Sequence, residues 1–187
     1  MILSKGDYVR YLEEDKISLG RKTRVPKHSD VIWRYQILLR KCEYYTNCKK
    51  NLLGKMMGAW YKYRKFKLGT MCGFSIPINV IDSGLAIVHV GPIIISNKAH
   101  IGKNLRVHVG VNIGADARNS EKAPTIGDNV YIAPGAKLFG GIQIADNIAI
   151  GANAVVNKDF LQQEVSIGGI PAKIISNKGS LEIIKRK

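Results

Sequence analysis

The stretch IGDNVYIAPGAKLFGGIQIADNIAIGANAV, residues 126–155, places a branched aliphatic residue at every sixth position. The series is Ile126, Ile132, Leu138, Ile144 and Ile150, and it continues to Val156. An α-helix cannot bury such a series on one face, because six residues at 100° each rotate successive positions by about 120°. The interval instead predicts short strands that turn a corner every six residues. Three strands then form one coil of about 18 residues in a parallel β-helix.

The same interval appears upstream, at Ile95, Ile101, Val107 and Ile113. We call these repeated positions anchors and expect them to fill the interior of coils stacked about 4.8 Å apart. The step from Ile113 to Ile126 is thirteen residues, one more than two repeats. ADARNSEKAP, residues 115–124, is rich in charged and small residues and predicts a loop insertion there. We therefore expect a mainly β domain over residues 75–178.

Residues 1–74 have a different pattern, which predicts an α-helical region. Ser29-Asp30 is a plausible N-cap for a helix over 31–45, and 51–67 and 5–19 predict two further helices. The expected apolar stripe of the helix over 51–67 is Leu52, Leu53, Met56, Met57, Trp60 and Tyr63, with Lys and Arg on the other side. Residues 179–187 are interpreted as a C-terminal tail.

The chain is strongly basic, with a net charge of +15 over 187 residues. Residues 1–70 hold 17 Lys and Arg against 6 Asp and Glu, so most of the excess lies in the helical region. This bias favours acidic partners such as phosphates, acidic glycans or a membrane surface; nucleic acid is disfavoured because no recognised binding motif accompanies the charge. No apolar leader or membrane-spanning run is visible, and the three cysteines form no CxxC pair, so we expect a cytoplasmic protein.

Three segments resemble the hexapeptide acyltransferase superfamily, whose members have a left-handed parallel β-helix. IVHVGPIIISNKAHIGKNLRVHVGVNIGA (87–115) is similar to the region of serine O-acetyltransferases that carries the catalytic histidine, IGANAVVNKD (150–159) to the coil that borders coenzyme A, and IGGIPAKII (167–175) to the closing element. The helices followed by GFSIPINV (73–80) look like a subgroup linked to capsule or lipopolysaccharide O-acetylation. The resemblance implies an acetyl-CoA-dependent acetyltransferase, active as a homotrimer with sites between subunits.

Acetyl transfer to a hydroxyl needs a general base, and histidine is suited to this role near neutral pH. His89 matches the catalytic histidine of the family and has the phase of an anchor, where an aliphatic residue is the ordinary choice. His108 follows 19 residues later, so we expect it one coil away on the same side, as an aid to catalysis or a structural residue. His100 and His28 are interpreted as structural or surface residues. Asp82 is the nearest upstream carboxylate that could orient His89.

The resemblance also implies the residues that hold acetyl-CoA. Backbone groups at Ala133 and Ala152 correspond to positions that bind pantetheine, Asn157 and Lys158 to a polar pair after the coil, and Lys173 to a cation near the phosphates. The alternative for both lysines is an ordinary surface role. No metal is expected, since the histidine spacing does not fit a β-helical carbonic anhydrase.

The residues around the expected catalytic histidine bear on the acceptor. Serine acetyltransferases carry an aspartate directly before the catalytic histidine and a second histidine before a proline, whereas this chain has Val88 and Ala123-Pro124. This departure favours a hydroxyl of a sugar or surface polysaccharide. The basic helices could hold an acidic glycan or make peripheral contact with the membrane; the alternative is that their lysines only keep the helices soluble. L-serine, an amino sugar acetylated on nitrogen, and a non-catalytic scaffold remain as alternatives.

Overall fold

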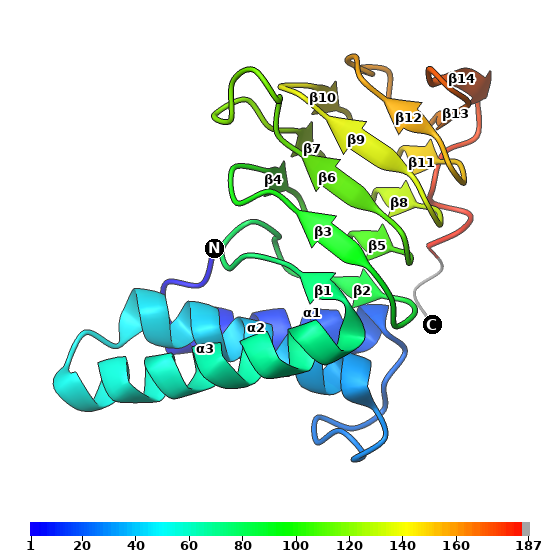
Figure 1. The fold of residues 1–187 in the computed structure, drawn as a ribbon. Helices are drawn as coiled ribbons and strands as arrows, with labels where there is room; N and C mark the ends of the chain where they lie inside the picture. Colours follow the sequence, from blue (N-terminus) through cyan, green and yellow to red (C-terminus); the bar gives the residue numbers. More distant parts are fainter. Residues whose placement is uncertain (185–187) are drawn as a thin grey trace.

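The computed structural model describes residues 1–184 and consists of three helices followed by a coil of short strands (Figure 1). The helices are α1 (Lys5–Ser18), α2 (Val31–Cys48) and α3 (Leu52–Cys72). The strands are β1 (Phe74–Ser75), β2 (Ala86–Ile87), β3 (Ile93–Ile95), β4 (His100–Ile101), β5 (Arg106–Val107), β6 (Asn112–Gly114), β7 (Thr125–Ile126), β8 (Tyr131–Ile132), β9 (Lys137–Phe139), β10 (Gln143–Ile144), β11 (Ala149–Ile150), β12 (Val155–Val156), β13 (Ser166–Gly168) and β14 (Lys173–Ser176).

The strands form the three walls of a left-handed parallel β-helix, which confirms the predicted fold class. Wall A has the order β1-β3-β6-β9-β12, wall B has β4-β7-β10, and wall C has β2-β5-β8-β11-β13-β14. All of these neighbours pair in parallel except β14, which folds back antiparallel on β13. The segment 115–124 leaves the coil between β6 and β7.

The anchors fill the interior as the interval predicts. Val107, Ile132 and Ile150 are stacked in wall C and are fully buried. At the corner between walls B and C the chain turns through Asn104, Asn129 and Asn147, whose φ values of 59°, 55° and 61° lie in the left-handed region. Their amides form a ladder with N···O distances of 2.7 and 2.9 Å. Asparagine tolerates this conformation, so one residue type both turns the chain and joins neighbouring coils.

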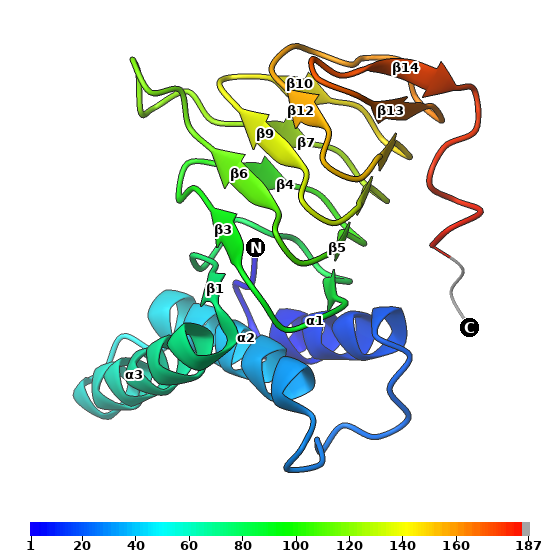
Figure 2. The ribbon, with the colours of Figure 1, turned by 45° about the vertical axis from the view of Figure 1, so that its right-hand side comes forward.

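The helices close the lower end of the β-helix (Figures 1 and 2). Gln36 on α2 donates to Leu85 O and accepts from Ile87 N, which satisfies backbone groups at the first rung of wall C. Arg40, also on α2, is fully buried, pairs with Asp15 of α1, and donates to the carbonyls of Ile81 and Asp82. A sheet edge with unpaired backbone groups is a liability, and these side chains pair it within the same chain.

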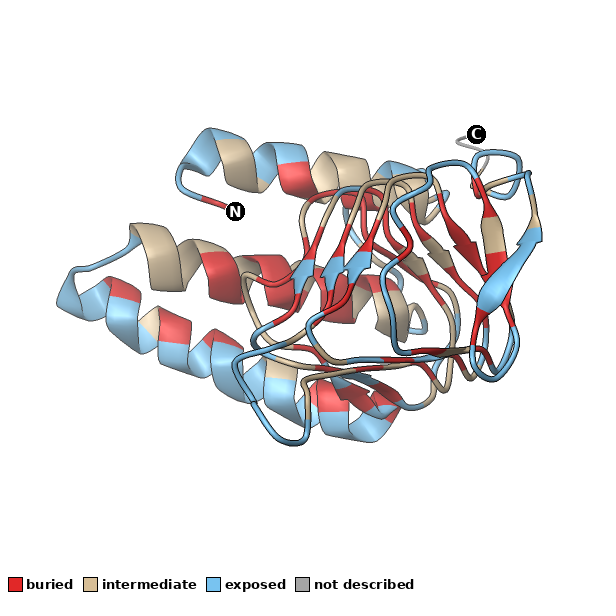
Figure 3. Cartoon of the chain, turned by 90° about the horizontal axis from the view of Figure 1, so that it is seen from above, coloured by how far each residue is buried: buried red, intermediate tan, exposed pale blue. Residues whose placement is uncertain are grey.

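The apolar stripe of α3 does not face the protein core. Five of the six stripe residues, Leu52, Leu53, Met56, Trp60 and Tyr63, are 47–76% exposed, and only Met57 is partly buried. Figure 3 shows the exposed outer side of this helix. The buried residues of the helix are instead Gly54, Gly58, Tyr61, Leu68, Gly69 and Cys72, and a Cβ on Gly69 would lie 2.8 Å from Phe74 O. Over residues 1–184, no helix combines the length and hydropathy needed to span a membrane.

Candidate active site at one corner of the β-helix

His89 and His108 lie on adjacent coils at the corner where wall C turns into wall A. Their ring centroids are 5.8 Å apart, with an interplanar angle of 55°. His89 is exposed and the ring of His108 is partly buried. Tyr131, one coil higher on β8, packs edge-on against His108 at a centroid distance of 5.2 Å. The structure therefore brings together the two histidines that the sequence singled out.

The anchor-like phase expected for His89 is wrong. Ile87 is the buried anchor and pairs with Val107, so this coil is 20 residues long at wall C instead of 18. The extra residues fall in the turn before β3, since Ile95 pairs with Ile113 at the regular spacing of 18. His89 therefore projects from an enlarged corner turn instead of pointing inward, which gives an exposed imidazole where an anchor would have been buried.

The enlarged turn lies directly against the turn of the next coil. Gly91 has φ of 137°, and a Cβ added there would lie 2.4 Å from Cγ2 of Val109. Only glycine allows this approach without displacing one of the two turns. The contact fixes the height of the turn that carries His89 relative to the turn that carries His108.

His108 has the electrostatic character of a neutral imidazole. Burial lowers its pKa, and the positive charge of Arg106 and the neighbouring His89 lower that pKa further. Its Nε2 atom is buried and makes no hydrogen bond to any of residues 1–184. A buried imidazole nitrogen without a hydrogen-bond partner is unusual, and together with the exposed histidine beside it this marks the corner as a candidate site.

Arg106 and Tyr131 are functional candidates that the sequence reasoning missed. They pair with each other on the outer side of wall C, one residue before the anchors Val107 and Ile132. Arg106 is partly exposed and forms no ion pair within the described part of the chain. The signal was present in the repeat, because side chains alternate between the two faces of a strand, so the residues directly before Val107 and Ile132 point to the same side as His108.

The remaining expected site residues divide between two corners. Ala133 and Ala152 lie on the corner that carries the histidines, and Lys173 begins β14 above them. Ala133 is buried and its N–H already donates to Ile150 O at 2.9 Å, so this group is not free to bind pantetheine. Asn157 and Lys158 follow β12 and lie at the corner between walls A and B. One chain therefore does not gather the whole expected set.

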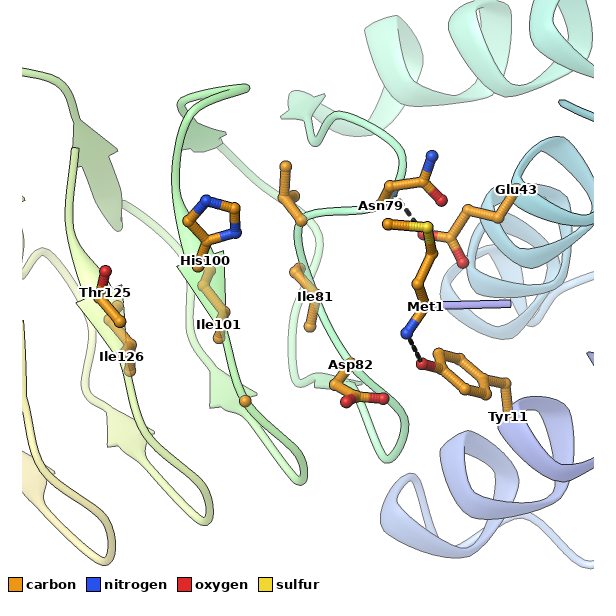
Figure 4. A pocket seen from close by; sticks show the side chains of 12 residues that line it. Met1, Tyr11, Glu43, Asn79, Ile81, Asp82, His100, Ile101, Thr125 and Ile126 are labelled. Atoms are coloured by element: carbon orange, nitrogen blue, oxygen red, sulfur yellow. Dashed lines mark hydrogen bonds between the residues drawn. The ribbon is translucent and has the colours of Figure 1, made fainter. Parts of the chain in front are cut away.

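Asp82 does not orient His89. It lies at the corner between walls B and C, where its carboxylate accepts from Ser83 N. Burial raises the pKa of Asp82, but a hydrogen bond from Tyr11 and further contacts outweigh burial and lower it. Figure 4 shows Asp82, Tyr11 and His100 around a cavity of about 320 Å³ on the wall B side. Neither His89 nor His108 lines this cavity.

Within residues 1–184, no cluster of three or more His, Cys, Asp or Glu side chains is arranged to hold a metal ion. The groups at the histidine corner are thus two imidazoles, a phenol, a guanidinium and the backbone of an enlarged turn. Such a set can move a proton and orient an anion.

Fold and repeats define the class: this is a left-handed β-helix built from hexapeptide repeats. No protein-family model matches the chain. Among curated proteins it is similar to serine acetyltransferases. It is 34% identical to that of Synechococcus elongatus over 100 residues, which is 53% of this chain and 41% of that protein. It is 37% identical to that of Staphylococcus epidermidis over 100 residues, 53% of this chain and 46% of that protein.

The match thus spans less than half the length of these curated relatives. Among solved structures, the serine acetyltransferase from Brucella abortus in complex with coenzyme A superposes with a TM-score of 0.69 at 22% identity. That alignment covers 94% of this chain and 70% of the other. The expected similarity to capsular or lipopolysaccharide O-acetyltransferases is not supported by these matches, which are named serine acetyltransferases.

Proposed function

We propose that this protein is an acetyl-CoA-dependent O-acetyltransferase with His89 as general base. The observation that carries the proposal is the exposed His89 ring beside the neutral, unpartnered His108 at a corner of a hexapeptide β-helix. The similarity to serine acetyltransferases, one of them solved with coenzyme A, supports the same reaction class. A general base is required because an alcohol does not ionise near neutral pH.

In this mechanism the acceptor hydroxyl gives its proton to the His89 imidazole as its oxygen attacks the thioester carbonyl. The tetrahedral intermediate then collapses, the C–S bond breaks, and the imidazolium returns the proton to the thiolate of coenzyme A. Within the turn after His89, Gly91 N–H donates to Cys72 O and Pro92 has no N–H. Val90 N–H is therefore the group in this turn that we assign to the oxyanion.

We place acetyl-CoA along the same corner, above His89. Ala152 is exposed on the fourth coil, three coils above the turn of His89, which is about 15 Å along the column at the usual strand spacing. Lys173 lies higher still and is exposed, where its charge would face the nucleotide phosphates. Ala133 lies between them and would contact acetyl-CoA only through its side chain, since its N–H already donates to Ile150 O.

Asn157 and Lys158 lie one wall away from this corner, so they would reach acetyl-CoA only on a neighbouring subunit. We therefore propose a homotrimer in which the histidine corner of one chain faces the wall A–B corner of the next. Lys158 is exposed, with its Nζ 5.5 Å from the centroid of the Phe160 ring, and is free to move toward a partner.

L-serine is the first candidate for the acceptor because the similar proteins are named serine acetyltransferases. Arg106 adds a physical reason: an unpaired cation beside the histidines can hold a carboxylate. A sugar hydroxyl, in particular that of an acidic sugar, is the second candidate. It is favoured because Val88 and Ala123 stand where serine acetyltransferases carry an aspartate and a histidine.

The test is acetyl-CoA consumption by the purified protein with L-serine, L-serine methyl ester, glucose, glucuronate and glucosamine. We expect activity with L-serine or glucuronate, and a weaker response to the ester and to glucose, which lack a carboxylate. Arg106→Gln should raise KM for the carboxylate acceptors only, and Lys103→Gln, at the exposed corner between walls B and C, is the matched control. Activity with glucosamine alone would replace this function by N-acetylation. If calorimetry detects no binding of acetyl-CoA, the protein is a non-catalytic scaffold instead of an enzyme.

We further propose that the protein acts in the cytoplasm, with its basic helical region turned toward the inner face of the membrane. Residues 1–70 hold most of the positive charge. The helices cap one end of the β-helix, so this charge lies at the far end from β14 (Figure 2). Attraction to acidic lipid does not depend on which acceptor is acetylated.

A further inference from the structure

We propose that the outer face of α3 binds directly to an anionic lipid bilayer surface, with its apolar side chains inserted among the headgroups. This outer face consists of Leu52, Leu53, Met56, Trp60, Tyr63 and Phe66. The proposal rests on the membrane location proposed above, but not on the acetyl-transfer reaction. It names the element that makes the contact and the chemistry of the surface it recognises.

The apolar side chains of the outer face are arranged for a flat apolar partner. Leu52, Met56, Tyr63 and Phe66 recur at helical spacing and are 62–76% exposed. The buried side of the same helix carries four small residues, Gly54, Gly58, Gly69 and Cys72, with Tyr61 and Leu68 as its two large ones. A helix that only packs on the protein core has the reverse arrangement, with bulky residues inward, so the outer face is built for a contact that the single chain does not supply.

The charge of this segment identifies the partner as acidic. From residue 44 to residue 81 the sequence contains no Asp or Glu, whereas α3 alone carries Lys55, Lys62, Arg64, Lys65 and Lys67. All of these except Lys65 are exposed, so four cations surround the apolar side chains. Long basic side chains beside an inserted apolar face extend to the headgroups, as in interfacial helices. Each such cation strengthens binding to an acidic surface about five-fold.

A groove next to the outer face supplies a place for a headgroup. It has a volume of about 550 Å³ and runs between the start of α2 and the end of α3. Its lining residues include the cations Arg34, Arg64 and Lys67 and the apolar residues Leu38 and Met71. No acidic residue lines this groove. Three cations and several apolar side chains in one groove match a phosphate headgroup whose acyl chains lie beside the apolar side chains of α3.

A second copy of the chain is a poorer occupant than lipid. Placing two outer faces together would oppose two clusters of exposed cations with no carboxylate on α3 to pair them. Like charges brought into one interface oppose association, whereas an acidic bilayer neutralises them and also accepts the apolar side chains.

The experiment is sedimentation of the full chain with vesicles of phosphatidylcholine, or of phosphatidylcholine mixed with phosphatidylglycerol. The test variant is Met56→Gln/Tyr63→Gln/Phe66→Gln, and its matched control on the β-helix is Phe139→Gln/Leu161→Gln/Ile175→Gln, whose parent side chains are also exposed. A charge variant, Lys55→Gln/Lys62→Gln/Lys67→Gln, has Lys137→Gln/Lys173→Gln/Lys178→Gln as its control. In a Trp33→Phe background, the fluorescence of Trp60 reports insertion.

We expect binding only to the mixed vesicles, a blue shift of Trp60 emission on binding, and weakening by at least ten-fold in either α3 variant while the controls bind normally. Acetyl transfer to a soluble acceptor should be unchanged in the α3 variants. If the unmodified chain binds vesicles but transfers no acetyl group, the proposed reaction is wrong and the lipid contact still stands. Equal binding of variants and controls would overturn the proposal. So would unchanged vesicle binding together with loss of a larger oligomer in light scattering, which would assign the face to a second copy.

Discussion

Replacing Gln36 tests whether hydrogen bonds from α2 stabilise the end of the β-helix. Its fully buried side chain donates to Leu85 O at 2.8 Å and accepts from Ile87 N at 3.0 Å. Gln36→Leu keeps a similar volume but leaves both backbone groups buried without a partner. Each such group costs about 1–3 kcal/mol. The free energy of unfolding should therefore fall by about 2–6 kcal/mol.

The measurement is chemical denaturation followed by far-ultraviolet circular dichroism, with the exposed Gln162→Leu as control. The control should change stability by no more than about 0.5 kcal/mol. Because Ile87 lies two residues before His89, Gln36→Leu should also lower acetyl transfer under conditions where the chain is still folded. A loss of stability below about 1 kcal/mol would refute the reasoning, because it would mean that these two hydrogen bonds do not hold the first rung.

Three further outcomes concern the histidine corner. His89→Ala should lower kcat about 10²–10⁴-fold with little change in the binding of acetyl-CoA, as measured by steady-state kinetics and calorimetry. The lowered pKa of His108 means that the unfolded chain binds protons which the folded chain does not. Stability should therefore decline as pH falls below about 6.5, and His108→Gln should reduce this decline in melting curves across pH. Gly91→Ala, whose Cβ would meet Val109, should impair activity far more than Gly140→Ala, where φ is also positive but no atom lies within 4 Å.

The sequence alone predicted the β-helix because its signal is periodic and local. The six-residue interval by itself assigns a residue such as Ile132 to the interior of the coil. Stacking of neighbouring coils then buries it. The same locality explains why α2 was found from its N-cap, Asp30, which accepts from Trp33 N. His89 and His108 were identified as neighbours because a coil has a nearly fixed length.

The tertiary structure decided what that interval does not encode. The first coil is two residues longer than the repeat, so Ile87 takes the interior position and His89 moves out to the corner. Most of the large apolar residues of α3 face outward because α3 packs on the protein through Tyr61, Leu68 and the close approach at Gly69, contacts between segments that no local pattern records. Arg106 and Tyr131 come together with the histidines only when coils stack. Periodicity fixes which side of a strand a residue faces, whereas coil length, helix packing and neighbours across coils depend on contacts between residues far apart in the chain.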